Sequence, residues 1–341
     1  MNRLPRTLRW LLSAAILVAL YWSVPLAEVS AVLAGANPAP TLAGLAAAAA
    51  TQVSVVFRLC MLFAARGPAP RYRELLRLHL ESLWYKLFVP GGALTSLVVR
   101  FAKLRAVERD ASALASTVLV ERWLATVGLA VLGGTCWAID RPQLLDSFAA
   151  IWLGALLAIL ASGVLLFARP IAHVTLRVVR TLLPAPFEER AERGFAALAA
   201  LRALPVAKQL RLAALAVLPH IFGTIAFATL GAALGITESV VTWGWIRTVV
   251  ILATMLPLSV AGLGVRELSL VYLLGFYAVV PADALALASL IFAVTVIAPA
   301  TIGPGLERRI VGMTESIEGG VREARATARC ALALSDPLTA L

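Results

Sequence analysis

Six apolar runs constrain the fold of this chain more than any other feature. Each run is close to the ~20 apolar residues that cross the hydrocarbon core of a bilayer as a helix. Of the 341 residues, 61% are hydrophobic and 14% are charged, a balance too apolar for a soluble domain of this length. The sequence therefore predicts an all-α, polytopic transmembrane helical bundle. The runs are Leu8–Leu26, Leu42–Ala65, Ala111–Ala138, Phe148–Ala168, Leu212–Ile236 and Ala284–Ile302.

The basic residues lie in short blocks between the apolar runs. The formal net charge is +11. Blocks of this kind are typical of cytoplasmic loops, so we expect no nucleic-acid partner. The first run is too long for the core of a signal peptide and is read as a retained helix. Arginines precede it at positions 3, 6 and 9, and two more follow the last run at positions 308 and 309. We predict a multi-pass protein of the plasma (inner) membrane with both termini in the cytoplasm.

Two further hydrophobic segments are interrupted by proline and glycine. They are Leu78–Leu104 and Trp243–Val280. Proline lacks a backbone donor and glycine leaves helical geometry easily, so each segment is expected to break into two helical legs. The predicted tips are Pro90, Gly91 and Gly92 in the first segment, and Pro257, Gly262 and Gly264 in the second.

The charges around the interrupted segments predict their topology. Both ends of the first segment are flanked by basic residues, which favours the cytoplasmic side, whereas acidic residues flank the second. Two re-entrant hairpins that enter from opposite faces fit this distribution, as an inverted repeat would produce. The alternative is that each leg crosses fully, which gives about eight to ten spans.

The remaining polar segments define the domain organisation. We predict a transmembrane domain over residues 1–306 and a polar cytoplasmic tail over residues 307–341. A basic connector runs from about residue 169 to 211 and carries apolar residues at helical spacing. It is expected either to lie on the inner membrane surface as an amphipathic helix or to be a solvated linker.

Charged side chains inside the apolar segments are the best candidates for a binding site. A charge at the centre of a bilayer costs about 2.5–3.5 kcal/mol on insertion scales, so such residues usually have a function. Glu121 lies about 15 Å into its run at 1.5 Å per residue, and Arg122 follows it. Arg266 and Glu267 come just after the second tip, and Arg100 follows the first.

Adjacent residues on a helix point in different directions, so each charge is expected to need a partner from another element. We predict that Glu121 pairs with Arg266 or Arg100, and that Glu267 pairs with Arg122. This cluster has a surplus of positive charge and is predicted to bind an anionic head group such as a phosphate. The alternative is an ion-pair network that only fixes helix packing. Arg58 is expected to extend toward the inner surface, and the same alternative stays open for Arg100.

Signatures of catalysis and of metal binding are absent from the sequence. It contains neither GxSxG nor HExxH, and the first outer loop offers only Glu28 to a transferase mechanism. The three cysteines are far apart, and the three histidines are isolated. We therefore predict no catalytic residue, no metal site and no cofactor. The cysteines are Cys60, Cys136 and Cys330, and the histidines are His79, His173 and His220.

Two motifs resemble the transmembrane region of the lysylphosphatidylglycerol synthase family, whose members are also called flippase-like proteins. The first runs from Pro90 through Arg100 to Val120-Glu121-Arg122-Trp123. The second, more specific motif is Leu256-Pro257 followed by Ala261-Gly262-Leu263-Gly264-Val265-Arg266-Glu267. The resemblance covers roughly residues 5–305. Where the family usually has a glycine and an acidic residue before the first arginine, this chain has Thr95 and Ser96.

The resemblance implies an integral membrane protein related to lipid translocation. Larger members carry a soluble domain that aminoacylates phosphatidylglycerol, and this chain shows no such domain, so synthase activity is not expected. Our first hypothesis is a translocase that moves an anionic lipid or a lipid-linked sugar between leaflets. The second is a membrane-embedded transferase, or an accessory subunit of one, in lipid or glycolipid biosynthesis, such as hopanoid or polyprenyl-sugar pathways. In that case a soluble enzyme would dock on the cytoplasmic connector.

Overall fold

The computed structural model describes residues 6–65, 67, 70–88, 93–105, 110–140, 154, 157, 161, 203–255 and 262–302. These residues form helices and turns, and no strand occurs among them. The all-α fold predicted from the apolar runs is therefore confirmed. In chain order the helices are α1 (Arg6–Ser23), α2 (Leu26–Ala34), α3 (Pro38–Ala64), α4 (Tyr72–Phe88), α5 (Ala93–Leu104), α6 (Ala111–Asp140), α10 (Val206–Ala233), α11 (Val240–Met255), α12 (Val265–Gly275), α13 (Pro281–Phe292) and the π-helical turn η2 (Ala293–Ile297).

Within the described residues, four helices are long and apolar enough to cross a membrane. They are α3, α6, α10 and the continuous helix Pro281–Ile302, which contains α13 and η2. These helices correspond to four of the six predicted runs, with ends that differ by a few residues. Together they identify a multi-pass membrane protein.

The first predicted run differs from the structure. Leu8–Leu26 is not one helix, because α1 ends at Ser23 and α2 begins at Leu26. Pro25 is the N-cap of α2. A proline disfavours helical geometry in the residue before it and cannot donate a helical hydrogen bond, which explains the break.

Several predictions fall on residues outside the described part of the chain. They concern nearly all of the fourth run, Phe148–Ala168, and the tail from residue 307. The basic connector from residue 169 is described only from residue 203 onward. There its last residues belong to α10, which begins at Val206.

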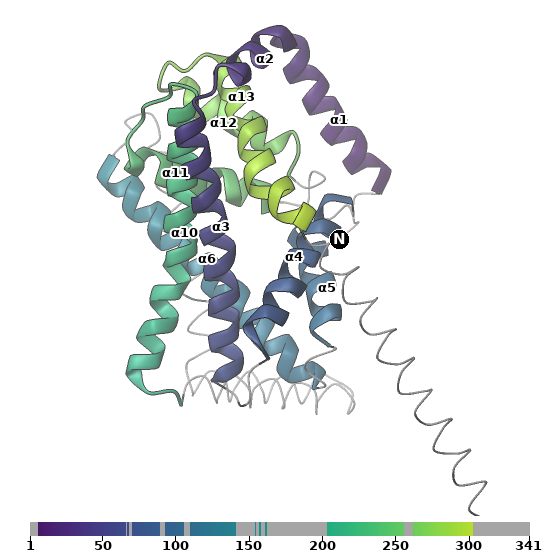
Figure 1. The fold of residues 1–341 in the computed structure, drawn as a ribbon, viewed down its shortest axis with the longest axis vertical. Coiled ribbons are helices and arrows are strands. Elements are labelled where there is room, and N and C mark those ends of the chain that lie inside the picture. The colour runs from purple at the N-terminus through teal and green to yellow at the C-terminus, as the bar shows by residue number, and fades with distance from the viewer. Residues whose placement is uncertain are drawn as a thin grey trace, which may run out of the picture.

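Both interrupted segments consist of two helices. The first is α4 and α5, which pack against each other, and the second is α11 and α12, which do the same. In Figure 1, α4 and α5 lie in the lower half of the bundle, and α11 and α12 in the upper half. Pro90, Gly91, Gly92 and Pro257 fall in the undescribed gaps between the legs. Gly262 and Gly264 have φ angles of 80° and 82°, a left-handed geometry that favours glycine.

Small residues allow the long helices to approach closely. A side chain at Gly128 of α6 would lie 2.0 Å from the backbone oxygen of Ala216 in α10. Gly231 of α10 lies under the Trp243 ring of α11. Apolar side chains gain nothing by leaving lipid for another apolar surface, so close backbone approach is a main source of helix association in membranes.

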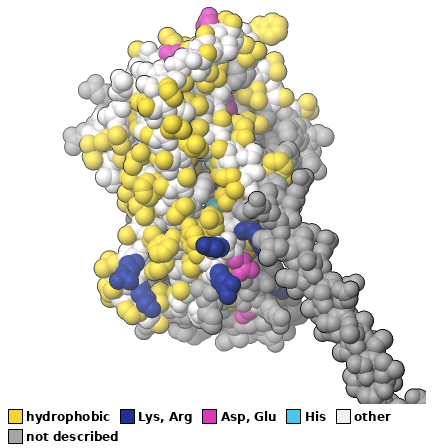
Figure 2. All heavy atoms as spheres, in the orientation of Figure 1, with side chains coloured by type: hydrophobic (Ala, Val, Ile, Leu, Met, Phe, Trp, Pro, Cys, Tyr) yellow, Lys and Arg dark blue, Asp and Glu magenta, His cyan; other side chains and the backbone are white. Residues whose placement is uncertain are grey.

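The surface of the bundle is polarised along its long axis. Figure 2 shows that hydrophobic side chains cover most of the visible face, whereas lysine and arginine side chains gather near its lower end. Asp140, the last residue of α6, accepts hydrogen bonds from three side chains. The donors are Thr242 Oγ1 at 3.2 Å, Trp245 Nε1 at 2.7 Å and Tyr277 Oη at 3.0 Å.

Candidate functional site

A cavity of about 330 Å3 lies inside the bundle. Every described helix except α1 and α2 contributes to its wall. The wall is partly apolar, but it carries several charged or polar side chains in a protein region where such groups are expensive. These are Gln52, Arg58, His79, Arg100, Glu121, Arg122, His220, Arg247 and Arg266.

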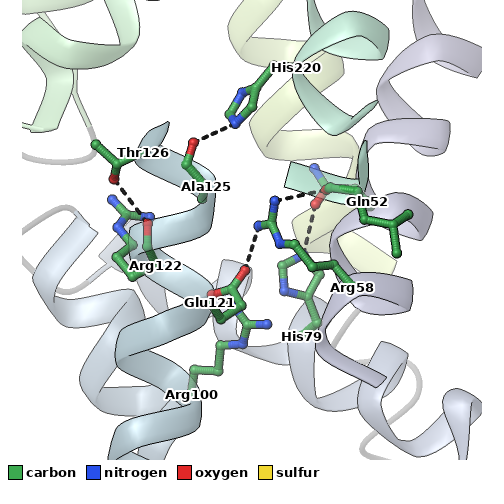
Figure 3. A network of polar contacts seen from close by, with 10 residues as sticks. Gln52, Arg58, His79, Arg100, Glu121, Arg122, Ala125, Thr126 and His220 are labelled. Carbon is green, nitrogen blue, oxygen red and sulfur yellow. Dashed lines mark hydrogen bonds and ion pairs between the residues drawn. The ribbon is translucent and has the colours of Figure 1, made fainter. Parts of the chain in front are cut away.

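Glu121 of α6 is the centre of the polar network (Figure 3). Its Oε1 accepts a hydrogen bond from Arg58 Nη2 of α3 at 2.7 Å, and its Oε2 accepts one from Arg100 Nη1 of α5 at 3.2 Å. The Glu121 side chain is only 5% exposed. One buried carboxylate thus joins three helices that are distant in the sequence. The predicted pairing of Glu121 with Arg100 is confirmed, and no ion pair joins Glu121 to Arg266 among the described residues.

The prediction that Arg58 extends to the membrane surface is wrong. Its side chain is 1% exposed and contacts Glu121. Its Nη1 also donates to the backbone oxygen of Leu215 in α10 at 3.2 Å. Pro219 lies inside α10 four residues later and has no N–H, so the Leu215 carbonyl lacks its ordinary helical donor. Arg58 therefore donates the hydrogen bond that Pro219 cannot supply to the Leu215 carbonyl.

The predicted partners of Arg266 and Glu267 are also wrong. Glu267 does not pair with Arg122 among the described residues. Its Oε1 accepts from Arg266 Nη2 at 3.1 Å, although the two residues are neighbours. Its Oε2 accepts from the Gly264 backbone N–H at 2.6 Å. The rule that neighbours point apart fails in the first turn of a helix, where a glutamate reaches back to the N-cap and an adjacent long side chain can follow it.

The Arg266 guanidinium makes a second contact. Its carbon lies 4.4 Å from the centroid of the Phe292 ring, within cation–π distance. The ring and the carboxylate hold the guanidinium on two sides, and it remains part of the cavity wall. At the N-terminus of α12, the Gly264 amide is bonded to Glu267 and is therefore not free for a ligand.

Two cavity arginines have no carboxylate partner within the described part of the chain. No ion pair joins the Arg122 guanidinium to a carboxylate there, and its side chain points away from Glu121 in Figure 3. Arg247 of α11 is 5% exposed, and its Nη1 is buried without a hydrogen-bond partner. Its guanidinium carbon lies 5.8 Å from the centroid of the Phe227 ring, within cation–π distance.

The position of Arg247 is enforced by its surroundings. A Cβ added to Gly223 of α10 would lie 2.2 Å from Arg247 Nη2. Only a residue without a side chain leaves room for the guanidinium at this crossing of α10 and α11. Sequence reasoning missed Arg247, although a lone arginine within a short apolar helix is itself a signal of function.

Two histidines that the sequence analysis treated as isolated also line the cavity. His79 Nε2 of α4 lies 2.8 Å from Gln52 Oε1 of α3, and His220 Nε2 of α10 lies 2.8 Å from the backbone oxygen of Ala125 in α6. Each histidine thus joins two helices of the wall. The turn η2 contributes Thr295 to the lining, and π-helical turns are frequent at functional sites.

The charge balance of the cavity determines what it can bind. Five arginines line it, and two carboxylates neutralise part of their charge: Glu121 in the wall and Glu267 behind Arg266. The net surplus among the described residues is therefore three positive charges, although only Arg122 and Arg247 lack a carboxylate partner. A buried surplus of this size disfavours cations and favours an anion with oxygen acceptors, because guanidinium groups donate to carboxylates and phosphates in a fixed fork.

The comparisons with known proteins agree with this architecture. No curated protein matches the chain. The family described as "Lysylphosphatidylglycerol synthase TM region" matches residues 7–303, which include every described helix apart from the first residue of α1. With a multi-pass helical bundle and a family match over most of its length, the chain belongs to the lysylphosphatidylglycerol synthase transmembrane-region family.

Proposed function

We propose that the protein translocates an anionic lipid, or a lipid-linked sugar, between the two leaflets of the inner membrane. The observation that carries this proposal is the arginine-lined cavity of about 330 Å3 inside a bundle of membrane-spanning helices. An anionic head group would enter the cavity, and its hydrocarbon tails would stay in the surrounding lipid.

The proposal also explains the two interrupted segments. In transporters, broken helices at corresponding places in two halves commonly form the binding site near the middle of the bilayer. Here α5 supplies Arg100 and α12 supplies Arg266, and both side chains reach the same cavity. In the proposed mechanism α4–α5 enters from the cytoplasmic face and α11–α12 from the outer face. Both termini lie in the cytoplasm, and small movements of either pair expose the cavity to one leaflet at a time.

Leaflet exchange of a labelled lipid tests the proposal. The purified protein is reconstituted in liposomes with a fluorescent anionic lipid, and quenching from outside reports how much label has crossed. The main variant is Arg122→Gln, because this side chain lines the cavity without an ion pair that supports the fold. The matched control is Arg211→Gln, an exposed arginine on α10 outside the cavity.

We expect the wild type and the Arg211 variant to accelerate exchange and the Arg122 variant to be strongly impaired. Equal exchange by both variants would contradict a role for the cavity. No acceleration by the wild-type protein, together with copurification of a lipid-modifying enzyme from its host, would favour the accessory-subunit alternative instead.

A further inference from the structure

The charge balance and one unpaired arginine narrow the class of head group. We propose that the cavity selects a phosphate or pyrophosphate group carrying about two negative charges over a phosphodiester carrying one, and that Arg247 is the residue that imposes this selection. The inference rests on the proposed function, because it assigns the substrate class of the same cavity.

The three surplus positive charges come from different parts of the cavity wall. Glu121 faces two arginines, so one positive charge remains in that part of the wall. The other two are Arg122 and Arg247, neither of which has a carboxylate partner among the described residues. Arg266 does not count, because Glu267 neutralises it.

The Arg247 guanidinium is positioned to donate a hydrogen bond to a ligand in the cavity. It is 95% buried, it lines the cavity, and its Nη1 lacks an acceptor. A buried donor without a partner is unfavourable, and such a group in a native structure calls for a ligand that completes it. Gly223 fixes the guanidinium from one side and the Phe227 ring packs on it from another, so it has little freedom to find an acceptor within the protein.

The two kinds of head group differ in negative charge and in the number of acceptor oxygens. A phosphodiester has two free oxygens that share one charge. A terminal phosphate has three strong acceptor oxygens and carries about −1.5 to −2 at pH 7. A monoanion would leave two of the three surplus charges uncompensated in a region of low dielectric, whereas a dianion would leave one. The additional negative charge of the dianion is therefore expected to contribute more to the binding free energy here than it would in water.

The experiment is a binding measurement rather than a transport measurement. Purified protein in detergent is titrated with dioleoyl phosphatidic acid and with dioleoyl phosphatidylglycerol, and bound lipid is counted by native mass spectrometry. The two probes have the same tails, so only the phosphate ester and its substituent differ. Inorganic pyrophosphate is added as a competitor, which distinguishes a lipid-specific site from a site for the free anion.

We expect phosphatidic acid to bind about tenfold more tightly than phosphatidylglycerol, the effect of one additional charge-assisted hydrogen bond. In Arg247→Gln this preference should largely disappear, and in the control Arg211→Gln it should remain. Arg247→Lys keeps the positive charge but lacks the paired N–H donors of a guanidinium group. This variant should retain part of the preference for phosphatidic acid. If Arg247→Gln does not fold, the intermediate behaviour of the lysine variant still tests the assignment.

Equal binding of both lipids by the wild type would overturn the inference, and so would an unchanged preference in Arg247→Gln. Displacement of phosphatidic acid by pyrophosphate at similar concentration would identify the free anion as a ligand of the same chemistry. Equal binding of both lipids, or an unchanged preference in Arg247→Gln, would leave the proposed translocation intact. Exchange of phosphatidylglycerol in liposomes would still support translocation.

Discussion

Helix α6 carries two carboxylates, buried Glu121 and half-buried Asp140. The partners of Glu121 are positively charged, and those of Asp140 are neutral. Glu121, ten residues into the helix, is bonded to two arginines and lines the cavity. Asp140, at the last position, is bonded to a hydroxyl, an indole and a phenol, and is not part of the cavity wall. The two residues are separated by 19 positions, or about 28 Å along a helix at 1.5 Å per residue.

The difference between these two carboxylates shows how to recognise a binding site in a membrane bundle. The three donors to Asp140 are neutral, so the cluster holds a single negative charge and its acceptor atoms are occupied. Burial raises the pKa of the Tyr277 phenol, and its hydrogen bond to Asp140 raises it further, so Tyr277 remains a donor. Around Glu121 the cations outnumber the carboxylates, and charge remains that only a further anion can neutralise. The Asp140 cluster thus joins helices, whereas the Glu121 cluster joins helices and keeps a surplus of positive charge that the proposed anionic head group would neutralise.

Removing the charge of Glu121 is the strongest way to test this comparison. Glu121→Gln leaves two buried guanidinium groups without a counter-charge, and removal of one partner from a buried pair costs about 3–5 kcal/mol. We expect a large drop in the unfolding temperature of the detergent-solubilised protein, followed by tryptophan fluorescence. Glu28→Gln, a change at an exposed glutamate of α2, is the control and should behave like the wild type. A Glu121 variant of wild-type stability would mean that its arginines are compensated elsewhere.

Removing the carboxylate at the other end of α6 should separate stability from binding. Asp140→Ala leaves the Trp245 indole without its acceptor, and an unsatisfied buried donor costs about 1–3 kcal/mol. We expect a moderate loss of stability in the same unfolding assay, with unchanged binding of phosphatidic acid by the protein that remains folded. Weaker lipid binding in this variant would show that the two clusters are coupled and would remove the distinction drawn here.

A smaller change at the same end sharpens the second prediction. Tyr277→Phe removes one hydrogen bond to the Asp140 carboxylate and keeps the ring that lies 6.3 Å from Trp245. A net loss of about 1.5 kcal/mol is expected, the lower end for a hydrogen bond to a charged group, because Tyr277 is only half-buried. Urea titration of the solubilised protein measures this change in the free energy of unfolding. A loss as large as that of Asp140→Ala would indicate that Tyr277 is the main support of the cluster.

Much of the fold was accessible from the sequence, and the reasons are local. Four of the predicted runs correspond to long apolar helices, because a backbone inside lipid must satisfy its own hydrogen bonds and has few ways to do so. The interrupted segments were also predictable, since proline and glycine act on the backbone in which they stand. The one described run that differed, Leu8–Leu26, contained such a residue in Pro25, and its effect was underestimated.

The candidate site was only partly accessible. Glu121, Arg122, Arg266 and Arg100 were singled out because charge inside an apolar segment is costly wherever it occurs. Which arginine reaches Glu121 depends on how α3, α5 and α6 cross, and no local pattern encodes that. The same holds for Arg58, whose place was decided by Pro219 of α10, a residue 161 positions away.

The sequence by itself determined that this chain is helical and spans a membrane, that two of its apolar segments are interrupted, and that it carries more positive than negative charge inside. These properties follow from apolar length, backbone chemistry and the cost of charge in lipid, which act along the chain. Only the tertiary structure decided that five arginines from α3, α5, α6, α11 and α12 surround one cavity, and that Arg247 has no carboxylate partner within the described part of the chain. Electrostatic pairing depends on distances of a few ångströms between helices, and packing alone sets those distances.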